Sequence, residues 1–184
     1  MPHTSSIPES HPLHRMFAGL VEHAFAARLG VADTGVTDYL TGLLTRFVHM
    51  DGVFPMRNIG GRRLEEVAEM LVEAYFPEPL TAQQRRAVIH KQVGDFTLFW
   101  TGVYPESLGR LRSSLRKDSL VDYISQGKKS YRLAAEAEQR EEPAEARVLG
   151  RISEEFEYCV YGLGLVRREW ERTAGPDTAR RLMQ

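Results

Sequence analysis

Apolar residues recur along this chain at the spacing of α-helices. Between Leu13 and Leu29 they occupy positions i, i+3, i+4 and i+7, which lie on one face of a helix. Five later segments repeat this spacing, and no segment keeps the strict alternation of a strand. Six helices are therefore expected, over residues 13–29, 37–50, 64–75, 81–104, 120–140 and 143–170. The pattern predicts an all-α, single-domain bundle of about six helices.

The ends of these helices follow from residues that stop or start helical structure. Gly30 comes directly after the first segment, where glycine commonly ends a helix. Asp118 or Ser119 is the expected N-cap of the fifth helix. The basic stretch before it, residues 106–117, is expected to be a loop with a short helical turn.

Composition divides the chain into a helical domain with a short segment at each end. The first twelve residues hold three prolines and two histidines, which is typical of a mobile leader. The expected domain therefore covers residues 13–175, between a leader at 1–12 and a tail at 176–184.

Two segments are apolar on every helix face and should be central in the bundle. Asp95 is the single charged residue between Val93 and Tyr104, and Glu157 is the single one between Phe156 and Val166. Glycines interrupt both segments, at Gly94, Gly102, Gly162 and Gly164. Because glycine disfavours helix, these positions are interpreted as points where a neighbouring helix approaches closely, with a bound ligand as the alternative.

Bulk properties narrow the function classes. The 184 residues are 42% hydrophobic and 27% charged, with a net charge of −1, so no global charge favours a polyanionic partner. Cys159 is the one cysteine and lies in an apolar run, which favours a buried, unreactive thiol. The start carries no signal-peptide pattern, and the longest apolar run is too short to cross a membrane. A cytoplasmic protein without a membrane partner is expected.

The usual motifs of enzymes and cofactor sites do not occur. Glu-x-x-His, His-x-x-x-His and His-Glu-x-x-His are missing, so no metal site is expected. Gly127-Lys128-Lys129-Ser130 is similar to the end of a phosphate-binding loop, but Asp122 and Lys129 occupy the places of its first glycine and its Ser/Thr. No cofactor is expected.

Positive charge next to a helix start suggests an anion site. Gly60 and Gly61 precede the third helix and Arg62 and Arg63 follow them, so free N–H groups and the helix dipole would favour an anion there. The alternative is a flexible turn with solvated arginines. The second basic stretch, Arg110–Lys117, lacks a helix-turn-helix context, and a solvated loop is expected there rather than a nucleic-acid interface.

Asp95 is the strongest single candidate for a functional residue. A buried carboxylate needs a partner, because leaving it unpaired is costly. Lys91 lies one turn earlier on the same helix, and Tyr123 and Tyr131 on the next long helix could also reach it. Together with Trp100, the two tyrosines and Asp95 could line a ligand pocket. The alternative is a structural role, as one member of a buried pair or as a cap of a helix restarted after Gly94.

The segment His90–Leu108 resembles part of a group of uncharacterised bacterial all-helical proteins. In those proteins a Gly-Asp pair inside an aromatic helix precedes a Gly-x-x-Pro-Glu turn, here Gly94-Asp95 and Gly102 to Glu106. The later Tyr-x-x-x-Gly-Lys, Tyr123 to Lys128, is also similar. The resemblance implies a bacterial origin and brings no activity, cofactor or catalytic residue with it.

Three functions are compatible with these patterns. The first is a non-enzymatic binding or interaction protein that forms homo-oligomers, because the chain carries a surplus of large apolar residues: Phe96, Phe99, Trp100, Tyr104, Tyr158 and Tyr161. The second is a small-molecule-binding protein or enzyme with a pocket near Asp95. The third is a nucleic-acid-associated regulator that uses Arg110–Lys117.

Overall fold

The structure, a computed structural model, describes residues 8–47, 64–75, 82–111, 113 and 117–174. Eight α-helices and no strand occur in these ranges, which confirms the all-α class. The chain forms two compact units, residues 1–53 with 162–184, and residues 54–161. The segments expected to be a mobile leader and a tail lie mostly or wholly outside the described residues.

The unit formed by the two ends of the chain is built from α1 (Pro12–Glu22), α2 (Thr34–Phe47) and the later part of α9 (Phe156–Ala174). Six residues of π-helix, His23–Arg28, continue α1. Gly30 then adopts a φ of 69°, which confirms that it stops the first helix. In the core of this unit Phe17 meets Trp170 edge to face, with ring centroids 5.3 Å apart.

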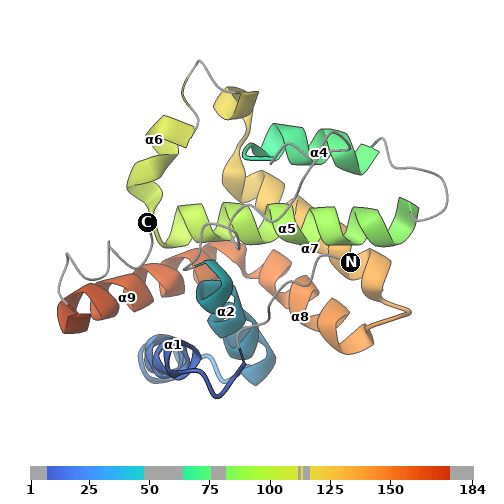
Figure 1. Cartoon of the computed structure of the whole chain (residues 1–184). Helices are drawn as coiled ribbons and strands as arrows, with labels where there is room; N and C mark the ends of the chain where they lie inside the picture. The colour runs from blue at the N-terminus through green and yellow to red at the C-terminus, as the bar shows by residue number, and fades with distance from the viewer. Residues whose placement is uncertain (1–7, 48–63, 76–81, 112, 114–116, 175–184) are drawn as a thin grey trace. The chain divides into compact units, whose positions relative to one another are not determined.

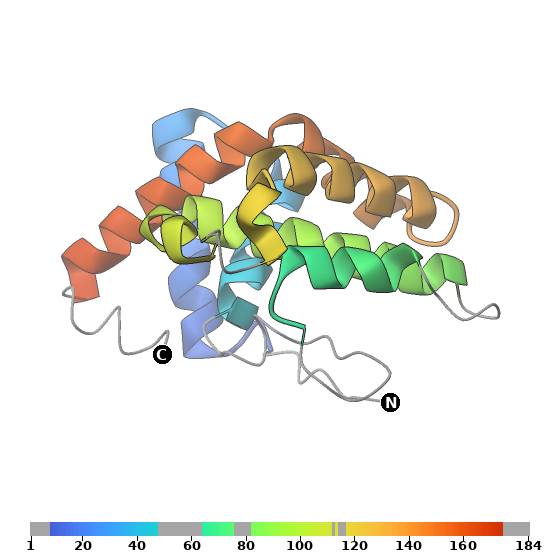
Figure 2. The same cartoon turned by 90° about the horizontal axis from the view of Figure 1, so that it is seen from above.

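The middle unit holds the remaining helices: α4 (Val67–Tyr75), α5 (Ala82–Gly102), α6 (Leu108–Leu111), α7 (Tyr123–Glu138), α8 (Pro143–Glu154) and the start of α9. α5 packs against both α4 and α7, and α7 packs against α8 (Figures 1 and 2). Two 3₁₀ turns, Pro105–Ser107 and Lys117–Leu120, connect α5 to α7 on either side of α6. The expected short helical turn in the basic stretch is therefore present.

Two details of the predicted helices were wrong. The sixth helix is broken into α8 and α9 at Glu155, whose φ of −104° and ψ of 27° leave helical geometry. The N-cap of α7 is Asp122 rather than Asp118 or Ser119. Its backbone is extended, and its Oδ1 accepts the N–H groups of Ile124 (3.0 Å) and Ser125 (3.1 Å).

The two apolar segments differ in burial. In α5 every residue from Val93 to Phe99 is buried. In α9, Tyr158 and Tyr161 are 42% and 56% exposed, while Phe156, Cys159 and four of the next seven residues are buried. The first segment is thus a central helix, and the second buries one side and presents two tyrosines on the other.

Glycines set how closely the helices of the middle unit approach. A Cβ added to Gly94 of α5 would lie 2.7 Å from the ring of Tyr131 on α7. A Cβ on Gly127 of α7 would lie 2.5 Å from both the Phe156 ring and the Thr97 hydroxyl. Each is too close for a side chain. Both glycines therefore serve helix packing, which the sequence interpretation proposed for Gly94.

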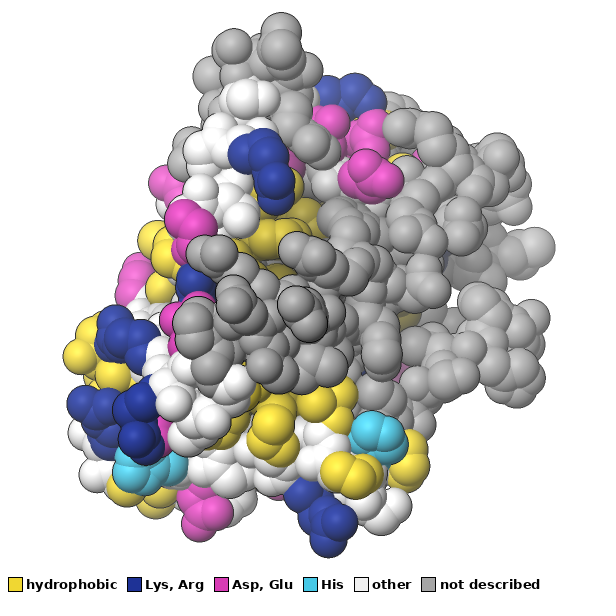
Figure 3. Space-filling model, turned by 60° about the vertical axis from the view of Figure 1, so that its left-hand side comes forward, with side chains coloured by type: hydrophobic (Ala, Val, Ile, Leu, Met, Phe, Trp, Pro, Cys, Tyr) yellow, Lys and Arg dark blue, Asp and Glu magenta, His cyan; other side chains and the backbone are white. Residues whose placement is uncertain are grey.

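Surface character agrees with the near-neutral charge. On the face shown in Figure 3, basic and acidic side chains of the described residues are interspersed with hydrophobic ones. Among the helices that the structure describes, none combines the length and the apolar character needed to cross a membrane.

We predict that Gly127→Ala destabilises the protein. The new methyl group would meet a buried aromatic ring, and overpacking of this kind costs about 1–3 kcal/mol. Gly19→Ala in α1 is the matched control, because no atom lies within 4 Å of its added Cβ, so it should gain up to about 1 kcal/mol from helix propensity. Chemical denaturation measures both variants, and equal stability of the two would contradict the packing role of Gly127.

Candidate functional site

Asp95 lies in the interior of the middle unit with Tyr131 as a partner. The carboxylate is on α5 and the residue is 3% exposed. The Tyr131 hydroxyl on α7 donates a hydrogen bond of 2.7 Å to Asp95 Oδ1. Gly94, next to the acid, leaves the space that the Tyr131 ring fills. Of the partners considered from sequence, Tyr131 is thus one that the structure provides.

Lys91 forms an ion pair with another acid. Its Nζ bonds to Glu145 of α8, so this side chain connects α5 to the α7–α8 hairpin. Both side chains are about one-third exposed, 33% and 32%. Pairs this close to solvent contribute about 1 kcal/mol or less, so this link orients α8 more than it stabilises the unit.

Tyr123 bonds to a different carboxylate. Its hydroxyl donates a 2.6 Å hydrogen bond to Oδ2 of Asp118, while its ring packs edge to face on Phe96 at a centroid distance of 6.2 Å. Trp100 also packs edge to face on Phe96, with ring centroids 6.1 Å apart. The structure therefore places Asp95 with Tyr131, and Tyr123 with Asp118, and an aromatic cluster around Phe96 connects Tyr123 and Trp100.

Trp100 carries a buried polar atom without an acceptor. Its ring packs edge to face on Phe99, with centroids 5.4 Å apart, and lies tilted against Tyr104 at 6.1 Å. The indole Nε1 is buried and has no hydrogen-bond partner among the described residues. A buried N–H without an acceptor costs about 1–3 kcal/mol. The Trp100 N–H is therefore a group of the predicted pocket that a hydrogen-bond acceptor would satisfy.

Asp118 acts as an anion at the start of α4. Its two oxygens accept the N–H groups of Val67 (3.0 Å) and Ala68 (2.8 Å), and the residue is 1% exposed. These are donors that a helix N-terminus leaves free. Lys117, the neighbouring residue, pairs with Glu69 of α4 and so is held at the same end. The carboxylate comes from a segment 50 residues further along the chain.

The predicted anion site, Gly60, Gly61, Arg62 and Arg63, lies outside the described residues. The helix that follows it does bind a negative group at its N-terminus, and that group is the chain's own Asp118. Sequence reasoning considered Asp118 as a cap of the fifth helix and missed its actual partner, the start of α4, because that partner is about 50 residues earlier in the sequence.

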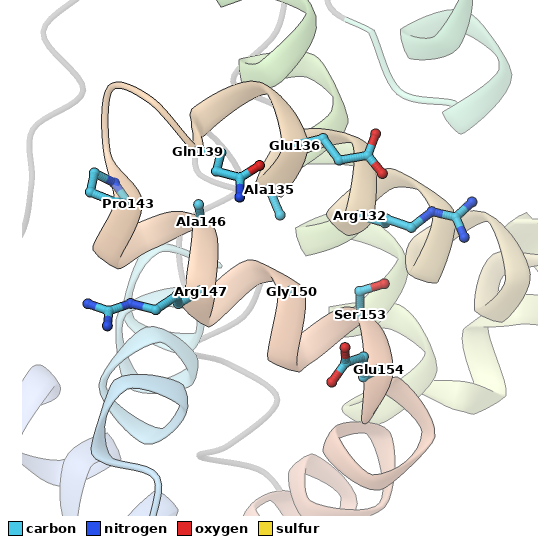
Figure 4. Close-up of a pocket in the computed structure, with 10 residues that line it drawn as sticks. All are labelled: Arg132, Ala135, Glu136, Gln139, Pro143, Ala146, Arg147, Gly150, Ser153 and Glu154. Atoms are coloured by element: carbon cyan, nitrogen blue, oxygen red, sulfur yellow. The ribbon is translucent and has the colours of Figure 1, made fainter.

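A groove between α7 and α8 is a further candidate site (Figure 4). It encloses about 610 Å³ and is lined by side chains from both helices of the hairpin. Small residues form its floor: Ala135, Ala146 and Gly150. Charged residues of both signs stand at its edges: Arg132, Glu136, Arg147 and Glu154. Sequence analysis did not identify this groove, because its lining combines two helices at positions that carry no motif.

His90 is a buried histidine on α5. It is 7% exposed, and its Nδ1 has no hydrogen-bond partner. Burial, followed by the nearby positive charges of Lys129 and Arg86, lowers its pKa from the ordinary value of 6.5. The imidazole is therefore neutral near pH 7, which avoids another positive charge close to Lys129 and Arg86.

Cys159 is the buried thiol that the sequence indicated. The residue is 2% exposed, and burial, with a smaller contribution from Glu155, raises its pKa to about 12. A thiol with such a pKa holds almost no thiolate at neutral pH. It is unsuited to nucleophilic chemistry.

The comparisons with known proteins assign no family to these features. No protein family, curated protein or solved structure gives a significant match to the chain. Within the described residues, no group of three or more His, Cys, Asp or Glu side chains could hold a metal ion.

We predict that Asp95 and Tyr131 are energetically coupled. Tyr131→Phe removes the hydroxyl that Asp95 accepts, and should lower the free energy of unfolding by about 2 kcal/mol, the value of a hydrogen bond to a charged group. In an Asp95→Ala background the same change should cost little. A double-mutant cycle measured by urea denaturation gives the coupling, and a coupling near zero would contradict a structural role for this hydrogen bond.

We also predict that His90 makes stability depend on pH. Its pKa is lower in the fold than in the unfolded chain, so the unfolded chain binds a proton more readily. The free energy of unfolding should therefore have its full value above pH 6.5 and decrease as the pH falls below 6.5. His90→Gln should flatten this dependence of the free energy of unfolding on pH. His23→Gln, at an exposed histidine, should leave the dependence unchanged. Thermal denaturation between pH 5 and 8 tests this, and an unchanged slope in His90→Gln would contradict it.

Proposed function

We propose that this chain is a cytoplasmic, non-enzymatic binding protein that self-associates as a homodimer. The observation that supports it is the pair of exposed tyrosines on α9. Tyr158 and Tyr161 lie one turn apart on one side of the helix, with 42% and 56% of each residue exposed. Large aromatic residues exposed side by side are typical of contact surfaces.

The other aromatic residues that motivated self-association have a different role. Phe96 and Phe99 are 0% and 2% exposed, so they belong to the core. Trp100 and Tyr104 pack on Phe99 and are only partly exposed. Of the large apolar residues named from the sequence, Tyr158 and Tyr161 are the two that are exposed, which makes the proposal more specific than the sequence did.

The surroundings of the two tyrosines fit an interface. Glu157, which directly precedes Tyr158 in α9, forms an exposed ion pair with Lys128 of α7 at 2.8 Å. Aromatic side chains beside a polar, solvated pair reproduce the usual anatomy of an interface, an apolar centre with a polar rim. Burying a tyrosine of this exposure would remove apolar surface from water, which is the general driving force of association.

A small-molecule ligand near Asp95 is a second candidate function. What supports it is the Trp100 indole N–H, which is buried without an acceptor next to the aromatic cluster around Phe96. A ligand with a hydrogen-bond acceptor and a flat apolar body would supply what this atom lacks. The acid itself is engaged by Tyr131, so it would orient such a ligand through that tyrosine rather than carry out chemistry.

We predict that the purified chain has twice its monomer mass of 20.9 kDa in solution. Tyr158→Ser with Tyr161→Ser should shift the protein to monomer, because it removes the two exposed rings and leaves the core intact. The matched control is Val72→Ser with Tyr75→Ser, a second exposed apolar pair, 56% and 59% exposed, on α4. Multi-angle light scattering provides the mass, and native mass spectrometry on the same sample reveals any retained ligand. A strict monomer at high concentration would overturn the proposal.

A further inference from the structure

The groove between α7 and α8 is open where a helix could enter it. Its floor consists of Ala135, Ala146 and Gly150, which keep side-chain volume low. A Cβ added to Gly150 would meet no atom within 4 Å. Gly94 and Gly127 differ from it, because rings already fill their space. The surface around Gly150 therefore has room that the chain itself does not use.

Two opposite charges stand on either side of this glycine, three residues before it and four residues after it. Arg147 and Glu154 line the groove on α8 and both are exposed. They are seven residues apart, so they share one helix face and lie about 10 Å apart along the axis, with Gly150 near the midpoint. No ion pair joins either of them to another described residue.

The neighbouring charges are already paired. Arg151, next to Gly150, bonds to Glu155 one turn later at 3.3 Å. Glu145, two residues before Arg147, bonds to Lys91 of α5. Among the described residues, Arg147 and Glu154 thus have no ion-pair partner.

We propose that the occupant of this groove is a second copy of the chain, with α8 packed antiparallel against its own copy across a two-fold axis at Gly150. In this arrangement Arg147 faces Glu154 of the partner subunit, and Glu154 faces Arg147 of the partner subunit. The proposal rests on the self-association proposed above and adds a contact between the two α8 helices to the one proposed for Tyr158 and Tyr161 of α9.

The charge pattern selects a second copy over other occupants. A two-fold contact joins each surface patch to itself, so the patch must be self-complementary. One positive and one negative group, placed on opposite sides of a point without a side chain, meet that condition. A ligand of a single charge would be attracted by one of them and repelled by the other.

Packing and charge have separate roles in this contact. Small residues at a helix crossing allow the two axes to approach closely. The groove volume of about 610 Å³ provides space for side chains of the incoming helix. Exposed ion pairs add little affinity by themselves, but they fix orientation and reject wrong pairings. On the same hairpin, Arg132 and Glu136 of α7 bring a further charge of each sign to the edge of the groove.

Charge reversal tests the pairing directly. Arg147→Glu alone and Glu154→Arg alone each place like charges at both symmetric contacts, and should weaken the dimer about tenfold or more at low salt. The double variant Arg147→Glu/Glu154→Arg restores opposite charges at both contacts and should regain wild-type affinity. An equimolar mixture of the two single variants should form a heterodimer, because both of its contacts then join opposite charges.

Two controls separate this contact from general effects. Arg168→Glu changes the net charge equally at an exposed arginine outside the groove and should leave the dimer unchanged. Gly150→Leu should abolish the dimer by filling the crossing point, while circular dichroism and the melting temperature show that the fold is retained. Gly19→Leu, at a glycine whose added Cβ also meets no atom within 4 Å, should remain dimeric.

Sedimentation velocity on the full chain gives the dissociation constants, and native mass spectrometry identifies the heterodimer by mass. Recovery of the dimer in the double variant and in the mixture supports the proposed contact. A dimer of equal affinity in all variants would overturn the α8 contact and leave self-association standing. A wild-type monomer would overturn both.

Discussion

The close contact of α5 with α7 is the constraint on which the middle unit depends. Gly94 of α5 leaves room for the Tyr131 ring, and Gly127 of α7 leaves room for the Phe156 ring. Each helix thus has a glycine where an aromatic side chain of a neighbouring helix packs. Because Tyr131 is seated in this way, its hydroxyl reaches the buried Asp95 carboxylate. Because Phe156 is seated in this way, α9 begins against α7, and the short turn at Glu155 between α8 and α9 is kept. A larger side chain at either glycine would move all of these elements.

The sequence was sufficient for features set by near neighbours. Helical periodicity predicted most helix positions, Gly30 predicted the end of the first helix, and the glycines of α5 pointed to close packing. It failed where distant residues meet. Asp118 was interpreted as a local cap, but it binds Val67 and Ala68 about 50 residues earlier, and Asp122 caps α7. The charged groove also escaped prediction, because only the packing of α8 on α7 brings its two walls together.

The buried polar groups of the middle unit are largely satisfied from within the chain. Asp95 bonds to Tyr131, Asp118 binds two backbone N–H groups and Tyr123, and Thr97 and Thr101 return their hydroxyls to backbone carbonyls of α5. A carboxylate held in this way costs little to bury, but it has less capacity left for a ligand. Exposed groups such as Arg147 and Glu154 on α8 and Tyr161 on α9 instead face outward. This contrast is why we assign binding to the surface of the hairpin rather than to its interior.

The remote cap of α4 also bears on how the chain folds as it is made. α4 has nine residues, too few for a stable isolated helix in water. Its anion, Asp118, is synthesised about 50 residues after Val67 and Ala68, which at usual translation speeds is a delay of roughly 3 to 10 s. During that interval the Val67 and Ala68 N–H groups lack the Asp118 carboxylate that accepts them in the fold. The segment that supplies Asp118 also brings Tyr123 and the beginning of α7. Completion of α4 is therefore timed by the arrival of the next long helix, so the order of assembly in this unit differs from the order of synthesis.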